Sequence, residues 1–190
     1  FNMLGKINAQ MGRNRCEVLK AVAGSRMVVQ SAVGLDDPSS RARLIEVFNR
    51  NGIGSERVEL RGATDFQAYL RNLSLIDISL DTFPFNGGTT SCHALWMGSP
   101  LVTMAGNVSV SRMGASLLSN IGLGELVADN AECFIKIASA LAGDLDRLQG
   151  IRSGMRERMR GSALMDAKQH AREMEEVFRV AWRDWCATNY

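Results

Sequence analysis

The chain has 190 residues, of which 46% are hydrophobic and 22% are charged. This composition is ordinary for a globular protein with a real core, and the length suits one domain or one domain with a helical extension. A net charge of +2 is too small to indicate nucleic-acid binding, and no apolar run approaches the roughly 20 residues that span a bilayer. We therefore expect neither nucleic acid nor a membrane among the partners.

The cysteines are spread along the chain without a CxxC pair, and only two histidines are present. A structural zinc site takes its ligands from closely spaced cysteines and histidines, so we expect no metal. Free thiols are typical of a reducing compartment and no signal peptide is visible, so the sequence favours a cytoplasmic protein. The residues concerned are Cys16, Cys92, Cys133, Cys186, His93 and His170.

Short apolar segments alternate with helical patterns over the first two thirds of the chain. Asp37-Pro38 and Thr64-Asp65 are residue types that begin helices. Strands of four or five apolar residues without strict alternation are typical of a parallel sheet covered on both faces. The pattern predicts an α/β fold with a Rossmann-like, doubly wound parallel sheet. We predict strands at 26–30, 58–60, 76–80 and 101–104, and helices at 13–23, 36–51, 64–71 and 89–97.

The last part of the chain is helical by pattern, with helices predicted at 111–120, 131–142, 145–160 and 166–188. We interpret the basic run at 152–160 as a solvated helix face rather than a polyanion site, and we expect His170 to face solvent. The final helix carries an apolar stripe, which is usually a seam packed in a core. The stripe consists of Met174, Val177, Phe178, Ala181, Trp182 and Trp185.

The segment Leu75–Thr103 carries the strongest functional signal. A buried strand runs into the glycine-containing loop Phe85–Gly88, and a helix opens at Thr89 and Thr90. Backbone N–H groups and the positive end of the helix dipole favour an anion there, and glycine lets the ligand come close. The sequence therefore predicts a phosphate or diphosphate site. The alternatives are that Asn86–Gly88 form only a tight turn and that the two threonines only cap the helix.

The order of these segments resembles the protein O-linked N-acetylglucosamine transferase family, and its bacterial, SPINDLY-like members most. The likeness covers essentially the whole chain. It implies the C-terminal, nucleotide-binding lobe of a GT-B glycosyltransferase that moves N-acetylglucosamine from UDP-GlcNAc to Ser or Thr hydroxyls of proteins. The family inverts the anomeric centre, requires no metal and usually carries tetratricopeptide repeats before its two lobes. The matching segments are FNMLGKI (1–7), GIGSERVELRG (52–62), DTFPFNGGTT (81–90), ALWMGSPLVT (94–103), SRMGASLL (111–118), IGLGELVA (121–128) and SALMD (162–166).

The resemblance assigns roles to single residues. Lys6 matches the lysine that contacts the diphosphate, where a cation stabilises the departing UDP; the alternative is an ordinary surface lysine. Thr89 and Thr90 match the helix start that holds the pyrophosphate, and Thr64 and Phe66 fall in the loop that grips the uracil. The donor-binding residues that we infer are Lys6, Thr64, Phe66, Tyr69, Gly87, Gly88, Thr89, Thr90 and His93.

Three positions depart from the family pattern. His93 stands where relatives carry Glu or Asp, and a neutral imidazole has one acceptor nitrogen, so it cannot accept from both ribose hydroxyls. Met3 replaces Gln or Asn near the phosphates. Tyr69 replaces His, and could stack on the uracil, donate its hydroxyl, or be a simple core aromatic.

The expected organisation is a nucleotide-sugar-binding lobe at 1–143 and helices at 144–190 that pack on the lobe or cross to an absent N-terminal lobe. Phe1 is already inside the family's opening motif, so we expect the lobe's first strand to be missing or supplied elsewhere. No residue has the features of a general base, and the chain is expected to be incomplete as a catalyst without its N-terminal lobe. Two other hypotheses stay open. One is a nucleotide-sugar-binding or scaffold module that has lost turnover, and the other is a transferase with a different donor.

Overall fold

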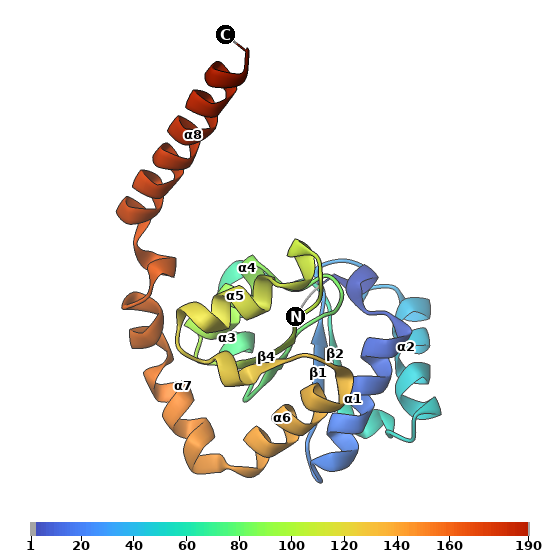
Figure 1. The fold of residues 1–190 in the computed structure, drawn as a ribbon. Coiled ribbons are helices and arrows are strands. Elements are labelled where there is room, and N and C mark those ends of the chain that lie inside the picture. The colour runs from blue at the N-terminus through green and yellow to red at the C-terminus, as the bar shows by residue number, and fades with distance from the viewer. Residues whose placement is uncertain (1–2, 190) are drawn as a thin grey trace.

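Parallel strands form the centre of the structure, a computed structural model that describes residues 3–189. Strand β1 (Met27–Gln30) pairs with β2 (Val58–Arg61), with Met27 opposite Val58. In a second sheet β4 (Leu101–Met104) lies between β3 (Ser79–Leu80) and β5 (Val127–Ala128). Helices lie on both sides of the strands (Figure 1). The predicted Rossmann-like α/β class is therefore confirmed.

The helices follow the strands along the chain much as the patterns predict. Helix α1 packs beside α6, and α4 packs beside α3 and α7. Short 3-10 turns, η1 to η5, complete the elements. The α-helices are α1 (Ala9–Ala21), α2 (Pro38–Arg50), α3 (Phe66–Ser74), α4 (Thr89–Trp96), α5 (Met113–Asn120), α6 (Ala131–Gly143), α7 (Leu145–Arg160) and α8 (Ala167–Asn189); the 3-10 turns are η1 (Leu4–Lys6), η2 (Ser55–Arg57), η3 (Ser109–Ser111), η4 (Gly124–Leu126) and η5 (Ala163–Met165).

Capping side chains fix where the first helices begin. The Asn8 carboxamide oxygen accepts from the Met11 N–H at 2.9 Å, so α1 begins earlier than the helix predicted from residue 13. Asp37 caps α2 ahead of a proline in its first turn, as predicted. Asp65 rather than Thr64 caps α3. Caps therefore decide these boundaries more sharply than apolar periodicity does.

The strands form two separate sheets, because β1 and β3 are not paired with each other. The facing edges of these strands line a cavity of about 920 Å³, to which α1, α6 and α7 also contribute. One apolar cluster surrounds β4 with α5, α6 and α7, and a second surrounds β1 and β2 with α1 and α2. Strand β3 is shorter than the predicted strand at 76–80, because only Ser79 and Leu80 pair with a neighbouring strand, β4. Strand β5 was not predicted. The missing first strand stays a prediction; Phe1 and Asn2 lie outside the described residues.

Helix α7 belongs to the body of the lobe. Its apolar face enters the main core through Leu148, Ile151 and Met155. Arg152 donates to the carbonyls of Ser74 and Ile76, so this part of the basic run is a tether and not a solvated face. The interpretation of residues 152–160 as a solvated face was therefore wrong for Arg152.

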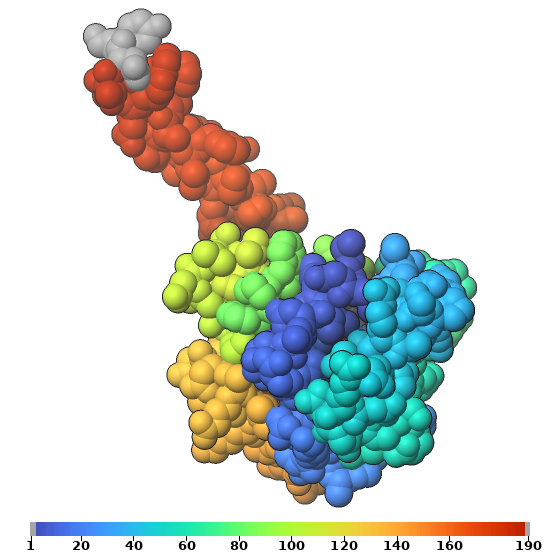
Figure 2. All heavy atoms as spheres, turned by 90° about the vertical axis from the view of Figure 1, so that its right-hand side faces the viewer, coloured from blue at the N-terminus to red at the C-terminus, as the bar shows by residue number. Residues whose placement is uncertain are grey.

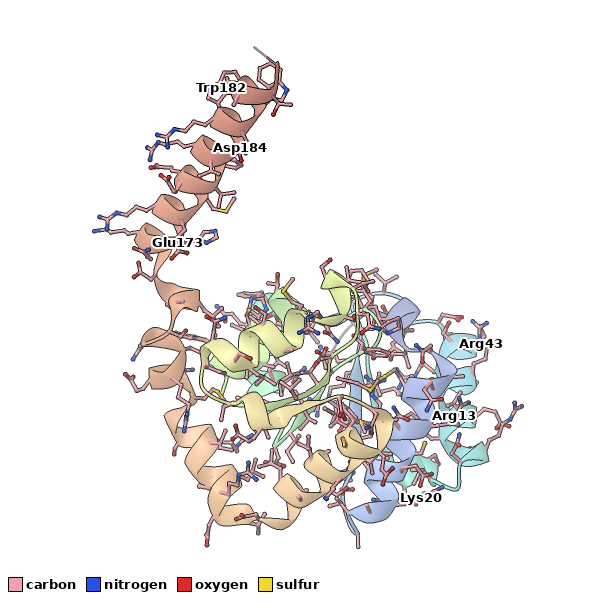
Figure 3. All side chains as sticks on the ribbon, viewed as in Figure 1. Arg13, Lys20, Arg43, Glu173, Trp182 and Asp184 are labelled. Carbon is pink, nitrogen blue, oxygen red and sulfur yellow. The ribbon has the colours of Figure 1, made fainter. Side chains whose placement is uncertain are left out.

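Helix α8 leaves the body and projects from it (Figures 1 and 2). Trp182 is 65% exposed and Trp185 is 50% exposed, and the two rings stack with centroids 5.4 Å apart. Figure 3 shows Trp182 and Asp184 far from the sheet. The prediction that the stripe is a packed seam was wrong for this structure, because periodicity predicts an apolar face but not what covers it. Within residues 3–189, no helix has the length and apolarity to cross a bilayer.

Candidate functional site

The glycine-containing loop follows β3 at the carboxyl end of its sheet and is held in shape by its own side chains. Asn86 is 2% exposed, and its amide donates to the Thr82 carbonyl at 2.7 Å. The Thr82 hydroxyl donates to the Phe85 carbonyl at 2.6 Å. The chain then enters α4 at Thr89, with Gly88 at the N-cap position. Because these polar groups have hydrogen-bond partners, the loop presents a fixed backbone to the start of α4.

The N–H groups of this loop point in two directions. The Asn86 N–H donates to the Val110 carbonyl at 2.9 Å, and the Gly87 N–H donates to Asp81 Oδ1 at 2.8 Å. Both are directed into the protein, so these two N–H groups do not face the predicted phosphate site. The first N–H groups of a helix have no partner within it. A Cβ built on Gly88 would meet no atom within 4 Å, so there is open space at this helix start.

Lys6 lies beside the loop although it is 80 residues away in sequence. Its ammonium donates to the Asn86 carbonyl at 3.2 Å and lies 4.0 Å from the centroid of the Phe85 ring. Asn8 supports the same approach, since its amide donates to the Phe83 carbonyl at 2.8 Å. Burial lowers the pKa of Lys6, and the charge of Asp81 opposes that shift. The ammonium and the start of α4 therefore lie around the same loop, as the family resemblance predicts.

An aromatic cluster adjoins the start of α4. The rings of Phe66 and Tyr69 stack with centroids 6.0 Å apart, and His93 meets each of them edge-on, at 5.5 and 5.7 Å. The Tyr69 hydroxyl lies 3.3 Å from His93 Nδ1 and hydrogen-bonds the Thr90 side chain. Burial raises the pKa of Tyr69, and the bond to Thr90 opposes the shift. Phe66 stays 61% exposed, so one aromatic face is open to a ligand.

The remaining predicted residues are less closely joined to this group. The Thr64 hydroxyl accepts from the Gln30 amide at 3.0 Å, which ties the exposed threonine to the carboxyl end of β1. Met3 is 65% exposed on the segment before Lys6. His170 is exposed on α8, as expected. Among residues 3–189 no group of three His, Cys, Asp or Glu side chains is placed to hold a metal ion.

Sequence reasoning missed one residue of the site, Asp81. It is 4% exposed and accepts hydrogen bonds from Gly87, Thr82 and Thr103. The sequence did contain a signal for it. An acidic residue directly after a buried strand and before a glycine loop is expected to be buried, and a buried carboxylate needs hydrogen-bond donors.

A cation, an open helix start and an exposed aromatic face lie side by side at the carboxyl ends of parallel strands. That combination, on a fold of the Rossmann type, suits a ligand with a diphosphate and a flat ring.

Comparison with known proteins identifies the family. The family model described as Glycosyl transferase family 41 matches residues 1–174, and the chain belongs to this family. The chain is 38% identical, over 98% of its own length and 20% of the other's, to an Arabidopsis thaliana protein named "Probable UDP-N-acetylglucosamine--peptide N-acetylglucosaminyltransferase SPINDLY". A Caenorhabditis elegans protein named "UDP-N-acetylglucosamine--peptide N-acetylglucosaminyltransferase" is 33% identical over 70% of this chain and 12% of that one.

A solved structure gives the same answer for the fold. A mutant of the Thermobaculum terrenum O-GlcNAc transferase matches with a TM-score of 0.94 and 35% identity, over 100% of this chain and 36% of that one. The resemblance inferred from the sequence is therefore confirmed. The chain spans about a fifth of the length of the curated relatives that match nearly all of it.

Proposed function

We propose that this chain is the UDP-sugar-binding lobe of an inverting protein O-glycosyltransferase, which transfers N-acetylglucosamine from UDP-GlcNAc to Ser or Thr hydroxyls of proteins. The observation that carries the proposal is the position of the Lys6 ammonium, 3.2 Å from the Asn86 carbonyl and beside the start of α4. Membership of the glycosyl transferase family supports the reaction class. The names of the relatives supply the donor and the peptide acceptor.

The proposed chemistry is stabilisation of a leaving group. Displacement at the anomeric carbon expels UDP, and negative charge grows on the diphosphate as the bond breaks. The Lys6 ammonium and the N–H groups of Gly88, Thr89 and Thr90 stabilise that charge more in the transition state than in the bound donor, which lowers the barrier. No metal is expected to be required. The uracil would lie against Phe66 and beside Thr64.

The lobe supplies only the donor half of this reaction. A GT-B site lies in a cleft between two lobes, so the proposal includes an N-terminal lobe of the same polypeptide that holds the acceptor hydroxyl. Tetratricopeptide repeats before that lobe are a further part of the proposal. The cytoplasm is the proposed location, supported by the free thiols of all four cysteines.

One observation favours a second candidate. The hydrogen bond between Tyr69 and His93 joins two of the positions that depart from the family pattern, and it occupies His93 Nδ1. A ribose would then be read by one remaining imidazole nitrogen instead of a carboxylate, which favours altered donor choice or lost turnover. A panel of nucleotide sugars separates these cases. Turnover of UDP-GlcNAc alone dismisses a different donor, and binding without any turnover supports a module that has lost activity.

Isothermal titration of UDP into the complete two-lobed protein tests the proposed function. We expect saturable heat with a dissociation constant below the millimolar range. No heat at millimolar UDP would count against a UDP-sugar lobe.

A further inference from the structure

Asp81 is a buried acidic group that the proposed chemistry does not use. It follows β3 directly, is 4% exposed, and lies behind the glycine-containing loop, on the side away from solvent. Its Oδ1 accepts from the Thr82 and Gly87 N–H groups, each at 2.8 Å, and its Oδ2 accepts from the Thr103 hydroxyl at 2.7 Å. Burial raises the pKa of Asp81, and the hydrogen bonds from Gly87, Thr103 and Thr82 oppose the shift. Two backbone N–H groups can only donate, so these contacts suit the ionised carboxylate.

The peptide group between Asn86 and Gly87 is held between two opposite charges. Its carbonyl oxygen accepts from the Lys6 ammonium at 3.2 Å, and its N–H donates to the Asp81 carboxylate at 2.8 Å. The C=O and N–H of a trans peptide point in opposite directions. The Lys6 ammonium therefore lies on one side of this peptide group and the Asp81 carboxylate lies on the opposite side. The orientation of this peptide therefore depends on both residues.

The surroundings leave Asp81 little freedom. A Cβ added to Gly114 of α5 would collide with Asp81 Oδ2 and the Thr103 hydroxyl, so only glycine allows this approach. Arg15 of α1 is the other charged group that faces Asp81, and it donates to the Leu80 carbonyl at 3.4 Å. Burial lowers the pKa of Arg15 to about 10, while the Asp81 charge and Cys16 oppose the shift.

We propose that Asp81 is a positioning residue of the donor site: its carboxylate fixes the peptide on which the Lys6 ammonium rests. This inference rests on the proposed function. It attributes the loss of donor affinity at high pH to Lys6 and Asp81 together. UDP binds the protonated ammonium, so affinity falls as the pH rises through the Lys6 pKa. Removing the Asp81 charge lowers that pKa and moves the fall in affinity to lower pH.

Two substitutions separate charge from geometry. D81N keeps the size of the side chain, and its Oδ1 can still accept from Gly87 and Thr82, so it removes mainly the charge. D81A removes both charge and hydrogen bonds, and we expect UDP affinity to fall about 10-fold to 100-fold, the range of a lost hydrogen bond to a charged group. T103V is the matched control. It removes a hydrogen bond from the far oxygen and leaves the charge and the Gly87 contact in place.

The test is UDP titration of the complete polypeptide that carries this lobe, from about pH 7, above the second phosphate pKa of about 6, to about pH 9.5. In the unmodified protein Arg15 keeps most of its charge over this range, since its pKa is about 10 and the Asp81 charge raises it. We expect the alkaline fall in affinity to move to lower pH in D81N and to stay in place in T103V. A D81N profile that coincides with that of the unmodified protein overturns the inference, whether or not D81A folds. If the unmodified protein does not bind UDP, the proposed function fails and this inference fails with it.

Discussion

Replacing Lys6 by Gln is the sharpest test of how this lobe assists the reaction. The substitution keeps a polar side chain of similar reach but removes the charge beside the Asn86 carbonyl. Two unit charges about 4 Å apart interact by about 4 kcal/mol at an effective dielectric constant near 20. Removing one preorganised group that stabilises developing charge costs about 10²-fold to 10³-fold in kcat. We therefore expect kcat for transfer to fall by that amount and UDP affinity to fall about 10-fold.

The assay is steady-state transfer to a peptide acceptor, with UDP titration alongside it. Lys6→Arg is the control, because it keeps a positive charge that does not titrate below pH 12. It should retain more activity than Lys6→Gln, and its UDP binding should persist at alkaline pH, where the unmodified protein weakens. This sign follows because burial lowers the pKa of Lys6, so that the cation is lost as the pH rises. A kcat for Lys6→Gln within about threefold of the unmodified value, which is under 1 kcal/mol, would refute the reasoning.

Three further changes test the fold. Asn86→Ala removes a buried amide that donates to the Thr82 carbonyl and should lower the free energy of unfolding in urea by about 1–3 kcal/mol; an unchanged midpoint would contradict the role given to the loop. Arg152→Ala should cost about 1.5–3 kcal/mol, because its guanidinium binds carbonyls before β3, and a loss below about 0.5 kcal/mol would argue against a tether. Changing Trp182 and Trp185 together to Gln should alter the same free energy by less than about 0.5 kcal/mol, since both are exposed, whereas a loss above about 2 kcal/mol would place them in a core.

The sequence predicted the site best where its parts are consecutive along the chain. A strand, a glycine loop and a helix start must adjoin because they are consecutive, and the loop and α4 appear where predicted. The meeting of Lys6 with this loop was predicted from the family resemblance, since no spacing rule joins residues 80 positions apart. Asp81 was missed because a sequence does not say which backbone N–H a carboxylate will face.

Other differences have physical reasons that also lie outside local pattern. The apolar stripe of α8 was correctly seen as a stripe, but whether it is covered depends on what lies beside it in three dimensions. The break between β1 and β3 involves strand neighbours, which are set by the packing of the whole lobe. The pairing of Tyr69 with His93 could not be read from either substitution alone, because it depends on how α3 packs against α4.

A structure of the protein with UDP bound is the most direct measurement of the central claim. The account predicts that diphosphate oxygens lie within hydrogen-bond distance, about 2.7–3.2 Å, of the Lys6 ammonium and of the N–H groups of Thr89 and Thr90. It would be contradicted by a well-ordered diphosphate bound elsewhere on the lobe, with the Lys6 ammonium still on the Asn86 carbonyl and the start of α4 unoccupied.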